Sequence, residues 1–414
     1  MLWGYQNVIL TIKSHLMTRT FCRPSSVWAV VIAACMLVNP AGAATFEKCV
    51  EGIRARALKA GIRADIVNAA FRNIRFDQKA VRFSRTQPEY RLSIWDYMAF
   101  LVDDVRIADG LRMMKTYQQT LRDVEKAYGV DRSILTALWG VESDYGREKG
   151  DFFIPQALSS IACAGRKPAA FKAELIQALR IVAAGEIKLA DLNGSWAGAF
   201  GQTQFIPSTY RRLAVDFDRD GRRDTIHSVP DALASAANYL KKAGWRSGLP
   251  WGFEVKVPQS YAGPVGRSRK LAISAWAKRG MSRPDGSPLP KTGSYALIRP
   301  AGRSGPAFLV SRNFDALYSY NAAQSYALAI SHLSDRLDGK GAFKTAWPTD
   351  DPGLTRAQRK RLQQLLIEQG YYKGEADGRV GPQTTDAIKQ AQRKAGLKPT
   401  GRPGTRILKV LAGN

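Results

Sequence analysis

Residues 131–146 of this chain read Asp131-Arg-Ser-Ile-Leu-Thr-Ala-Leu-Trp-Gly-Val-Glu-Ser-Asp-Tyr-Gly146, which predicts an almost wholly apolar helix with a carboxylate, Glu142, close to its end. Asp131 is a natural N-cap, and the apolar side chains that follow leave little polar surface. A carboxyl group removed from water holds its proton to higher pH and can act as a general acid near neutrality. The alternative is a capped core helix whose Glu142 merely reaches solvent, since structural carboxylates are common.

A second segment, further along the chain, combines glycines with aromatic and amide side chains. It reads Gly194-Ser-Trp-Ala-Gly-Ala-Phe-Gly-Gln-Thr-Gln-Phe-Ile-Pro-Ser-Thr-Tyr210. Glycine lets a backbone lie close to a ligand, while glutamine and serine supply neutral donors and acceptors that suit sugar hydroxyl and acetamide groups. Taken alone, the segment is equally compatible with a tight structural loop.

Together these segments resemble the lytic murein transglycosylases, specifically the membrane-bound lytic transglycosylase B family. The matching motifs, in the family's order across most of residues 50–340, are Gly140-Val-Glu-Ser-Asp-Tyr-Gly-Arg147, Gly194-Ser-Trp-Ala-Gly-Ala199, Gln204-Phe-Ile-Pro-Ser208, Asn238-Tyr-Leu240 and Tyr320-Asn321. The resemblance implies a lysozyme-like helical catalytic domain with Glu142 as the catalytic acid. It also implies substrate-binding residues that line the cleft, at Ser195, Gln204, Tyr239, Tyr320, Asn321, Tyr326 and Tyr97.

The implied activity is cleavage of the β-1,4 bond between N-acetylmuramic acid and N-acetylglucosamine in peptidoglycan, with formation of 1,6-anhydromuramic acid. Because the muramic C6 hydroxyl is the nucleophile, one carboxylate can suffice and the chemistry requires no cofactor. Two alternatives stay open. A hydrolytic muramidase normally uses two carboxylates, and the nearby Asp144 lies on a different helix face from Glu142. A catalytically inactive peptidoglycan-binding scaffold would leave Glu142 unexplained.

The N-terminal residues 1–43 read as a secretory signal peptide. They contain basic but no acidic residues, an apolar run from Val27 to Val38, and small residues before the predicted cleavage near Ala43. This pattern predicts export to the periplasm. The apolar run is shorter than the ~20 residues that a membrane-spanning helix needs, so we expect no transmembrane span. Cys35, preceded by Ile-Ala-Ala, offers an alternative as a lipoprotein processing site.

Only Cys49 and Cys163 lie outside this signal segment. In an oxidising compartment two such cysteines are expected to form a disulfide, here between the N-terminal segment and the region after the catalytic helix. Two unpaired buried thiols are the alternative, because free cysteine is often a core residue.

The net charge of +27 would attract polyanions, so nucleic acid has to be considered as a partner. The basic residues are scattered, however, with no basic block longer than residues 356–361, and an exported chain rarely meets nucleic acid. We therefore expect peptidoglycan glycan strands and cell-envelope anions as partners, no nucleic acid, and a monomer.

The residue composition of successive segments also predicts where the domains begin and end. A mainly α (α+β) catalytic domain is predicted over residues 44–345, and residues 250–312, rich in glycine, proline and short β-like runs, predict a small inserted β subdomain. Residues 346–353 read as a linker by their turn residues. The tail, residues 354–414, resembles the first type of peptidoglycan-binding domain, which implies a small three-helix module. The matching positions there include Leu362, Leu365, Leu366, Gly370, Asp377, Gly378, Gly381, Thr384, Gln392 and Gly396.

One acidic stretch predicts a structural calcium site. Asp216, Asp218 and Asp220 stand at alternate positions before a glycine, which is the spacing of an EF-hand loop. The backbone carbonyl of Arg222 would be a further ligand, and the family resemblance implies Asp231 as the closing acid, because a histidine occupies the usual glutamate position. The alternative is a solvated acidic turn neutralised by arginines.

Overall fold

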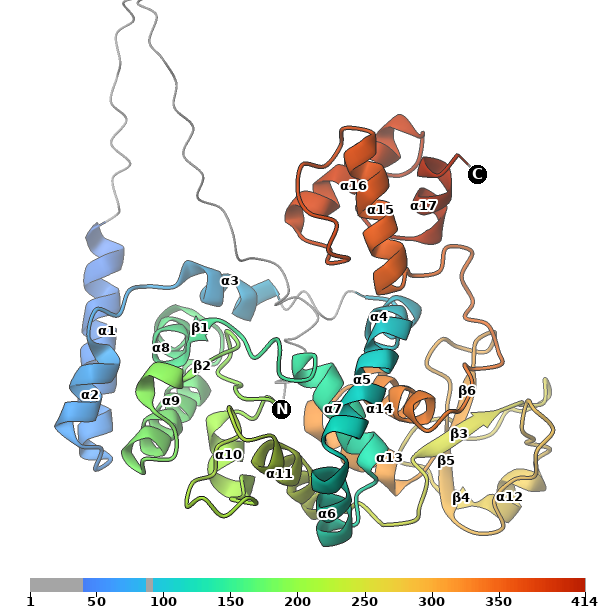
Figure 1. Ribbon diagram of the computed structural model, residues 1–414, viewed down its shortest axis with the longest axis horizontal. Coiled ribbons are helices and arrows are strands. Elements are labelled where there is room, and N and C mark those ends of the chain that lie inside the picture. Colours follow the sequence, from blue (N-terminus) through green and yellow to red (C-terminus); the bar gives the residue numbers. More distant parts are fainter. Residues whose placement is uncertain (1–39, 87–91, 414) are drawn as a thin grey trace, which may run out of the picture.

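The computed structural model describes residues 40–86 and 92–413 (Figure 1). The described residues are mostly helical and form two small sheets, which confirms the predicted mainly α class. The predicted signal peptide lies outside the described residues except for positions 40–43, where the first helix begins. Cys35 also lies outside them.

One group of helices packs around a hydrophobic cluster that includes Ile53, Phe71, Leu158, Leu179 and Phe200. Its helices are α1 (Pro40–Lys59), α2 (Ala64–Phe71), α3 (Gln78–Thr86), α8 (Ile154–Ala164), α9 (Pro168–Ala183) and α10 (Pro207–Leu213). The predicted disulfide is confirmed, because Cys49 on α1 is bonded to Cys163 on α8.

A second cluster surrounds helix α7 (Arg132–Ser143), in which residues 133–143 are all buried. The surrounding helices are α4 (Ile94–Leu101), α5 (Asp104–Thr116), α6 (Gln118–Tyr128), α11 (Val229–Lys242), α13 (Arg312–Asn321) and α14 (Gln324–Leu337). Asp131 precedes α7 as predicted, but its side chain makes no capping hydrogen bond. Burial of the apolar side chains, rather than a side-chain cap, therefore stabilises this helix.

The predicted β subdomain is a four-stranded antiparallel sheet with strand order β3-β6-β5-β4 (Figure 1). Its strands are β3 (Gly252–Val255), β4 (Leu271–Ala272), β5 (Ser294–Ile298) and β6 (Ala307–Val310), and the short helix α12 (Ile273–Ala277) follows β4. The sheet builds its own cluster around Trp276 and Tyr295. A second, two-stranded sheet pairs β1 (Phe152–Phe153) with β2 (Asn193–Gly194).

The C-terminal module contains the three predicted helices, α15 (Arg356–Glu368), α16 (Pro382–Lys394) and α17 (Thr405–Leu411), around a separate cluster of leucine, isoleucine and alanine side chains. Figure 1 shows this module at one end of the molecule, next to α4 and α5. Ion pairs join it to the helical body: Arg402 contacts Asp96 at 2.5 Å, and Arg359 lies 3.9 Å from Asp103.

Candidate active site

Glu142 lies in the last turn of α7, where only 2% of its surface is exposed. The Tyr326 hydroxyl, on α14, donates a hydrogen bond to Glu142 Oε1. Glu142 borders a cleft of about 560 Å³, whose other lining residues come mainly from the segment 204–212, from α11 and from α13. These residues are Gln204, Phe205, Ile206, Ser208, Thr209, Arg212, Tyr239, Arg267, Asp315, Tyr318, Ser319, Tyr320, Asn321 and Ala322.

Aromatic side chains pack together beside Glu142. The Tyr239 and Tyr320 ring centroids are 4.6 Å apart, and the Phe205 ring lies about 6 Å from both. Tyr320 in turn stacks on Tyr326 at 6.3 Å. Flat aromatic faces of this kind can cover the C–H surface of a sugar ring.

The hydroxyl groups of this aromatic cluster are held by backbone carbonyls. Tyr239 donates to Ser319 O at 2.8 Å, and Tyr320 donates to Thr203 O at 2.6 Å. Burial raises the pKa of Tyr239, and burial together with the nearby Glu142 raises the pKa of Tyr320. Both side chains therefore stay neutral phenols at physiological pH, which keeps the aromatic wall uncharged.

Two amide side chains in the cleft present polar atoms that the protein leaves unpaired. Gln204 has a left-handed backbone, with φ of 51°, and its Nε2 donates to Lys149 O and Gly201 O, but its buried Oε1 has no hydrogen-bond partner among the described residues. Asn321 is 3% exposed, and both of its amide atoms lack a partner there. Because unpaired buried polar atoms are costly, these amides fit a ligand with hydroxyl or acetamide groups.

Three of the expected substrate residues do not line the cleft. One is Tyr326, which is fully buried and donates its hydrogen bond to Glu142 instead. The other two are Ser195 and Tyr97. Ser195 is fully buried and does not line the cleft; its hydroxyl accepts a hydrogen bond from Ala199 N at 2.9 Å and so shapes the glycine-rich loop. The same loop requires Gly194, since a Cβ there would lie 2.2 Å from Ala199 O. Tyr97 lies in the core; after burial, Glu142 and Tyr320, it is a further cause of the raised pKa of Tyr326.

Neither acid near Glu142 is available as a second catalytic carboxylate. Asp144 lies outside the cleft, and its carboxylate contacts Arg147 at 3.0 Å and Arg106 at 3.6 Å. Asp315, which the sequence did not identify, lines the cleft, but its carboxylate bonds to Arg267 at 2.9 Å and to another cation, Lys270, at 2.5 Å.

Sequence reasoning missed the charged part of this cleft. Arg212 could have been predicted from the sequence, because it lies on α10 just after the glutamine motif. Arg267 and Asp315 come from the β subdomain and from α13, and no local sequence signal connects them. Tyr318, whose ring lies 3.8 Å from the Arg267 guanidinium carbon, was missed for the same reason.

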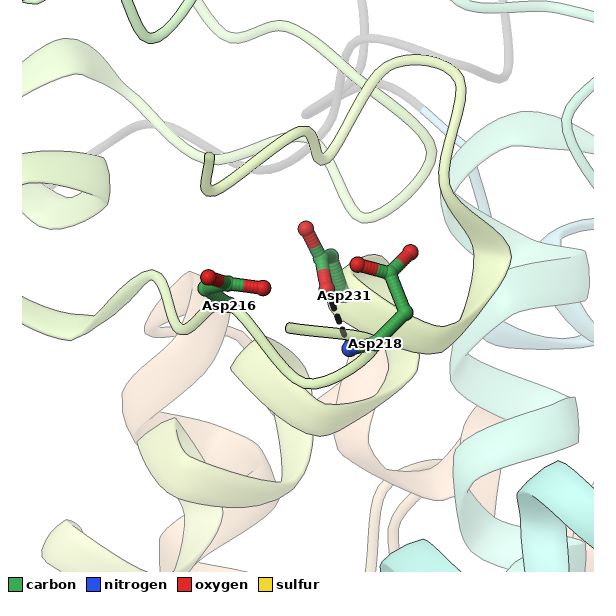
Figure 2. A group of neighbouring side chains, drawn as sticks. All are labelled: Asp216, Asp218 and Asp231. Carbon is green, nitrogen blue, oxygen red and sulfur yellow. Dashed lines mark hydrogen bonds between the residues drawn. The ribbon is translucent and has the colours of Figure 1, made fainter. Parts of the chain in front are cut away.

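The acidic loop brings together carboxylate oxygens of Asp216, Asp218 and Asp231 within 4.8 Å of one another (Figure 2). Asp231 accepts hydrogen bonds from the backbone N–H of Phe217 at 2.7 Å and of Asp224 at 2.8 Å, so it holds the loop closed. Asp216 Oδ1 is buried without a hydrogen-bond partner in the described chain. An orphaned carboxylate oxygen beside two other carboxylates fits a calcium ion.

Asp220 is not part of this group. Its carboxylate accepts a hydrogen bond from the backbone N–H of Arg222 at 2.9 Å and lies 3.3 Å from the Arg222 guanidinium. The structure thus gathers three of the four expected carboxylates, while Asp220 and the Arg222 carbonyl remain predicted ligands.

Two family models match the chain. The transglycosylase SLT domain matches residues 45–335, and the putative peptidoglycan binding domain matches residues 355–411. The chain is also 31% identical over 239 residues to the membrane-bound lytic murein transglycosylase B of Escherichia coli (strain K12). That alignment covers 56% of this chain and 64% of the relative, so the chain spans slightly less than two thirds of the relative's length.

Solved structures are similar as well. SltB3 from Pseudomonas aeruginosa, in complex with NAG-anhNAM-pentapeptide, matches with a TM-score of 0.72 and 38% identity, over 89% of this chain and 99% of that one. The Escherichia coli lytic transglycosylase Slt35, in complex with calcium, matches with a TM-score of 0.61 and 25% identity, over 72% and 94%.

Proposed function

Because this chain belongs to the transglycosylase SLT domain family, we propose that it is a lytic murein transglycosylase. It cleaves the β-1,4 bond between N-acetylmuramic acid and N-acetylglucosamine and leaves 1,6-anhydromuramic acid. The observation that carries the proposal is the environment of Glu142, a buried carboxylate that borders an aromatic and amide-lined cleft and accepts a hydrogen bond from Tyr326. The related SltB3 structure contains a peptidoglycan fragment, which supports the same substrate class here.

Binding relies on neutral groups that suit a neutral polysaccharide. The faces of Tyr239 and Tyr320 cover sugar C–H surfaces, and the unpaired amide atoms of Gln204 and Asn321 hydrogen-bond to hydroxyl and acetamide groups. Since these amides are already buried and fixed by the fold, little side-chain freedom is lost when the strand binds. The strand is thereby oriented with its scissile bond at Glu142.

In the reaction, protonated Glu142 gives its proton to the glycosidic oxygen as the bond from that oxygen to muramic C1 breaks. The muramic C6 hydroxyl attacks C1, and its proton passes to the Glu142 carboxylate as the new C1–O6 bond forms. The carboxyl group is thus restored to its starting state without water. An intramolecular nucleophile at high effective concentration explains why one carboxylate is enough.

The muramidase alternative requires a second carboxylate that is able to act as a base or a nucleophile. Within the cleft as described, the acids are Glu142 and Asp315, and Asp315 already binds two cations. An inactive scaffold would leave unexplained why a buried carboxylate, Glu142, borders the cleft with a hydrogen bond from Tyr326.

We also propose that the acidic loop binds a structural calcium ion through Asp216, Asp218 and Asp231, with Asp220 and the Arg222 carbonyl as further ligands. The ion would neutralise the crowded carboxylates and stiffen the loop before α11. The calcium complex of the related Slt35 supports this site. None of the proposed catalytic steps depends on it.

For location, we propose export to the periplasm with cleavage of residues 1–43, action on glycan strands as a monomer, and lipid attachment at Cys35 as the alternative. The disulfide supports an oxidising compartment. Among the described residues no helix is long and apolar enough to cross a membrane.

The test is digestion of purified sacculi in ¹⁸O-labelled water, followed by mass analysis of the products. We expect muropeptides that end in anhydromuramic acid and carry no label. A parallel digestion with a hydrolytic muramidase is the control and should give reducing ends labelled at the anomeric carbon. Labelled reducing ends as the main product of this protein would reclassify it as a muramidase.

A further inference from the structure

The proposed sugar-binding cleft contains an arginine whose positive charge a neutral sugar does not neutralise. Arg212, on α10, lines the same cleft as Glu142 and is exposed. In the described part of the chain it forms no hydrogen bond or ion pair, whereas its neighbour Arg211 donates a hydrogen bond to Gln177 outside the cleft. A guanidinium group in this position is available to an anion from the substrate.

A second arginine reaches this cleft from the β subdomain. Arg267 bonds to Asp315 through Nη1 and lies over the Tyr318 ring, which together fix the guanidinium plane. Lys270 bonds to the same Asp315 carboxylate, so two cations share one anion. With Arg212 added, this region of the cleft carries an excess of positive charge.

N-acetylmuramic acid within a strand and N-acetylglucosamine carry no free carboxylate, because the lactyl group is in amide linkage to the stem peptide. The stem peptides are the part of peptidoglycan that does carry carboxylates. We propose that Arg212, assisted by the positive charge at Arg267 and Lys270, binds a stem-peptide carboxylate, so that the enzyme prefers peptide-bearing strands to bare ones. This inference rests on the proposed function and adds to it a preference for glycan strands that carry stem peptides.

The experiment compares kcat/KM on three preparations of one glycan. The first is strands with stem peptides, and the second is strands from which an amidase has removed the peptides and whose lactyl carboxylates, freed by that cleavage, have then been converted to amides. The third is peptide-bearing strands whose peptide carboxylates have been converted to amides. Arg212→Gln should reduce the preference for peptide-bearing over bare strands about 5- to 10-fold, the effect of one partly exposed charge-assisted hydrogen bond. Amidation should reduce the wild-type rate by a similar factor and affect Arg212→Gln much less, since the same interaction is already lost.

Arg211→Gln is the matched control, because it removes the same charge from the same helix outside the cleft. It should keep the wild-type preference. An unchanged preference in Arg212→Gln, or an equal loss in Arg211→Gln, would overturn the inference while leaving the proposed reaction intact. Failure of the wild-type protein to release anhydromuropeptides from any preparation would instead refute the proposed function itself.

Discussion

Arg356, at the start of the C-terminal module, lies 3.5 Å from Asp144, the residue that ends the helix carrying Glu142. Asp144 adopts a left-handed backbone with φ of 50°, and its carboxylate also lies close to Arg106 and Arg147. The peptidoglycan-binding module is therefore in electrostatic contact with the end of the catalytic helix.

This contact predicts a pH-dependent contribution to stability. Burial alone would raise the pKa of Asp144, but Arg106, Arg356 and Arg147 outweigh burial and hold the pKa below its usual value. The ionised carboxylate therefore stabilises the fold fully above the unfolded pKa of about 3.9, and this stabilisation is lost as the pH falls through the lower folded pKa. Asp144→Asn, which suits the left-handed backbone, should lower the free energy of unfolding by about 3 kcal/mol at pH 7.

Thermal melting from pH 7 to pH 3 measures this effect. The difference in Tm between wild type and Asp144→Asn should shrink as the pH falls below about 4. Arg356→Gln, which removes only the partner from the C-terminal module, should lower Tm by less. A difference that stays constant with pH would show that the carboxylate charge does not stabilise the contact.

Glu142→Gln should abolish turnover while the fold and the binding of sacculi persist. The substitution keeps the shape of the side chain and removes its transferable proton, so the rate of anhydromuropeptide release should fall at least ~10²-fold. Co-sedimentation with sacculi and circular dichroism serve as controls for binding and folding. Near-normal release by this variant would rule out Glu142 as the acid.

Tyr326→Phe tests the positioning of Glu142. Tyr326 is fully buried and donates its hydrogen bond to the carboxylate, and burial, then Glu142, raise the pKa of Tyr326, so it stays a donor at working pH. Removing the hydroxyl should lower kcat about 10-fold with little change in KM, since the group acts on the acid. Tyr261→Phe is the matched control, because that hydroxyl bonds to Pro264 O in the β subdomain. Equal losses of kcat in both variants would argue against the positioning role.

Calcium should raise the Tm of the wild-type protein, because an ion that binds the native state stabilises it by mass action. Asp216→Asn combined with Asp218→Asn should remove the response, since these side chains supply oxygens to the cluster. Asp65→Asn, at an exposed ion pair with Arg63, should keep it. No shift at millimolar calcium would favour an acidic turn that binds no ion.

Local patterns in the sequence predicted much of the fold. The apolar run around Glu142, the β-like runs of residues 250–312 and the leucine pattern of the tail each specify an element through short-range periodicity. The Cys49–Cys163 pair was predictable because few cysteines lie outside the signal segment. The helices and strands depend on local sequence, and the disulfide prediction required only a count of the cysteines.

The parts of the site that the sequence did not predict depend on side chains that meet only in three dimensions. The sharing of Asp315 by Arg267 and Lys270 joins residues 45 or more positions apart, and no periodicity encodes such a contact. Ser195 matched a cleft residue by its motif, yet its hydroxyl bonds within its own loop. The packing of the folded chain decides the direction in which a side chain points, and a sequence motif contains no information about that packing.

The disulfide has a further consequence for the integrity of the molecule. Cys49 and Cys163 are separated by 114 positions, and Glu142 lies between them, so the acid sits inside a covalently closed ring of the chain. A single proteolytic cut anywhere in that ring would open the backbone without releasing a fragment. Nicked and intact molecules would then migrate together until the disulfide is reduced, and the segment bearing Glu142 would stay tied to the rest of the molecule after the cut.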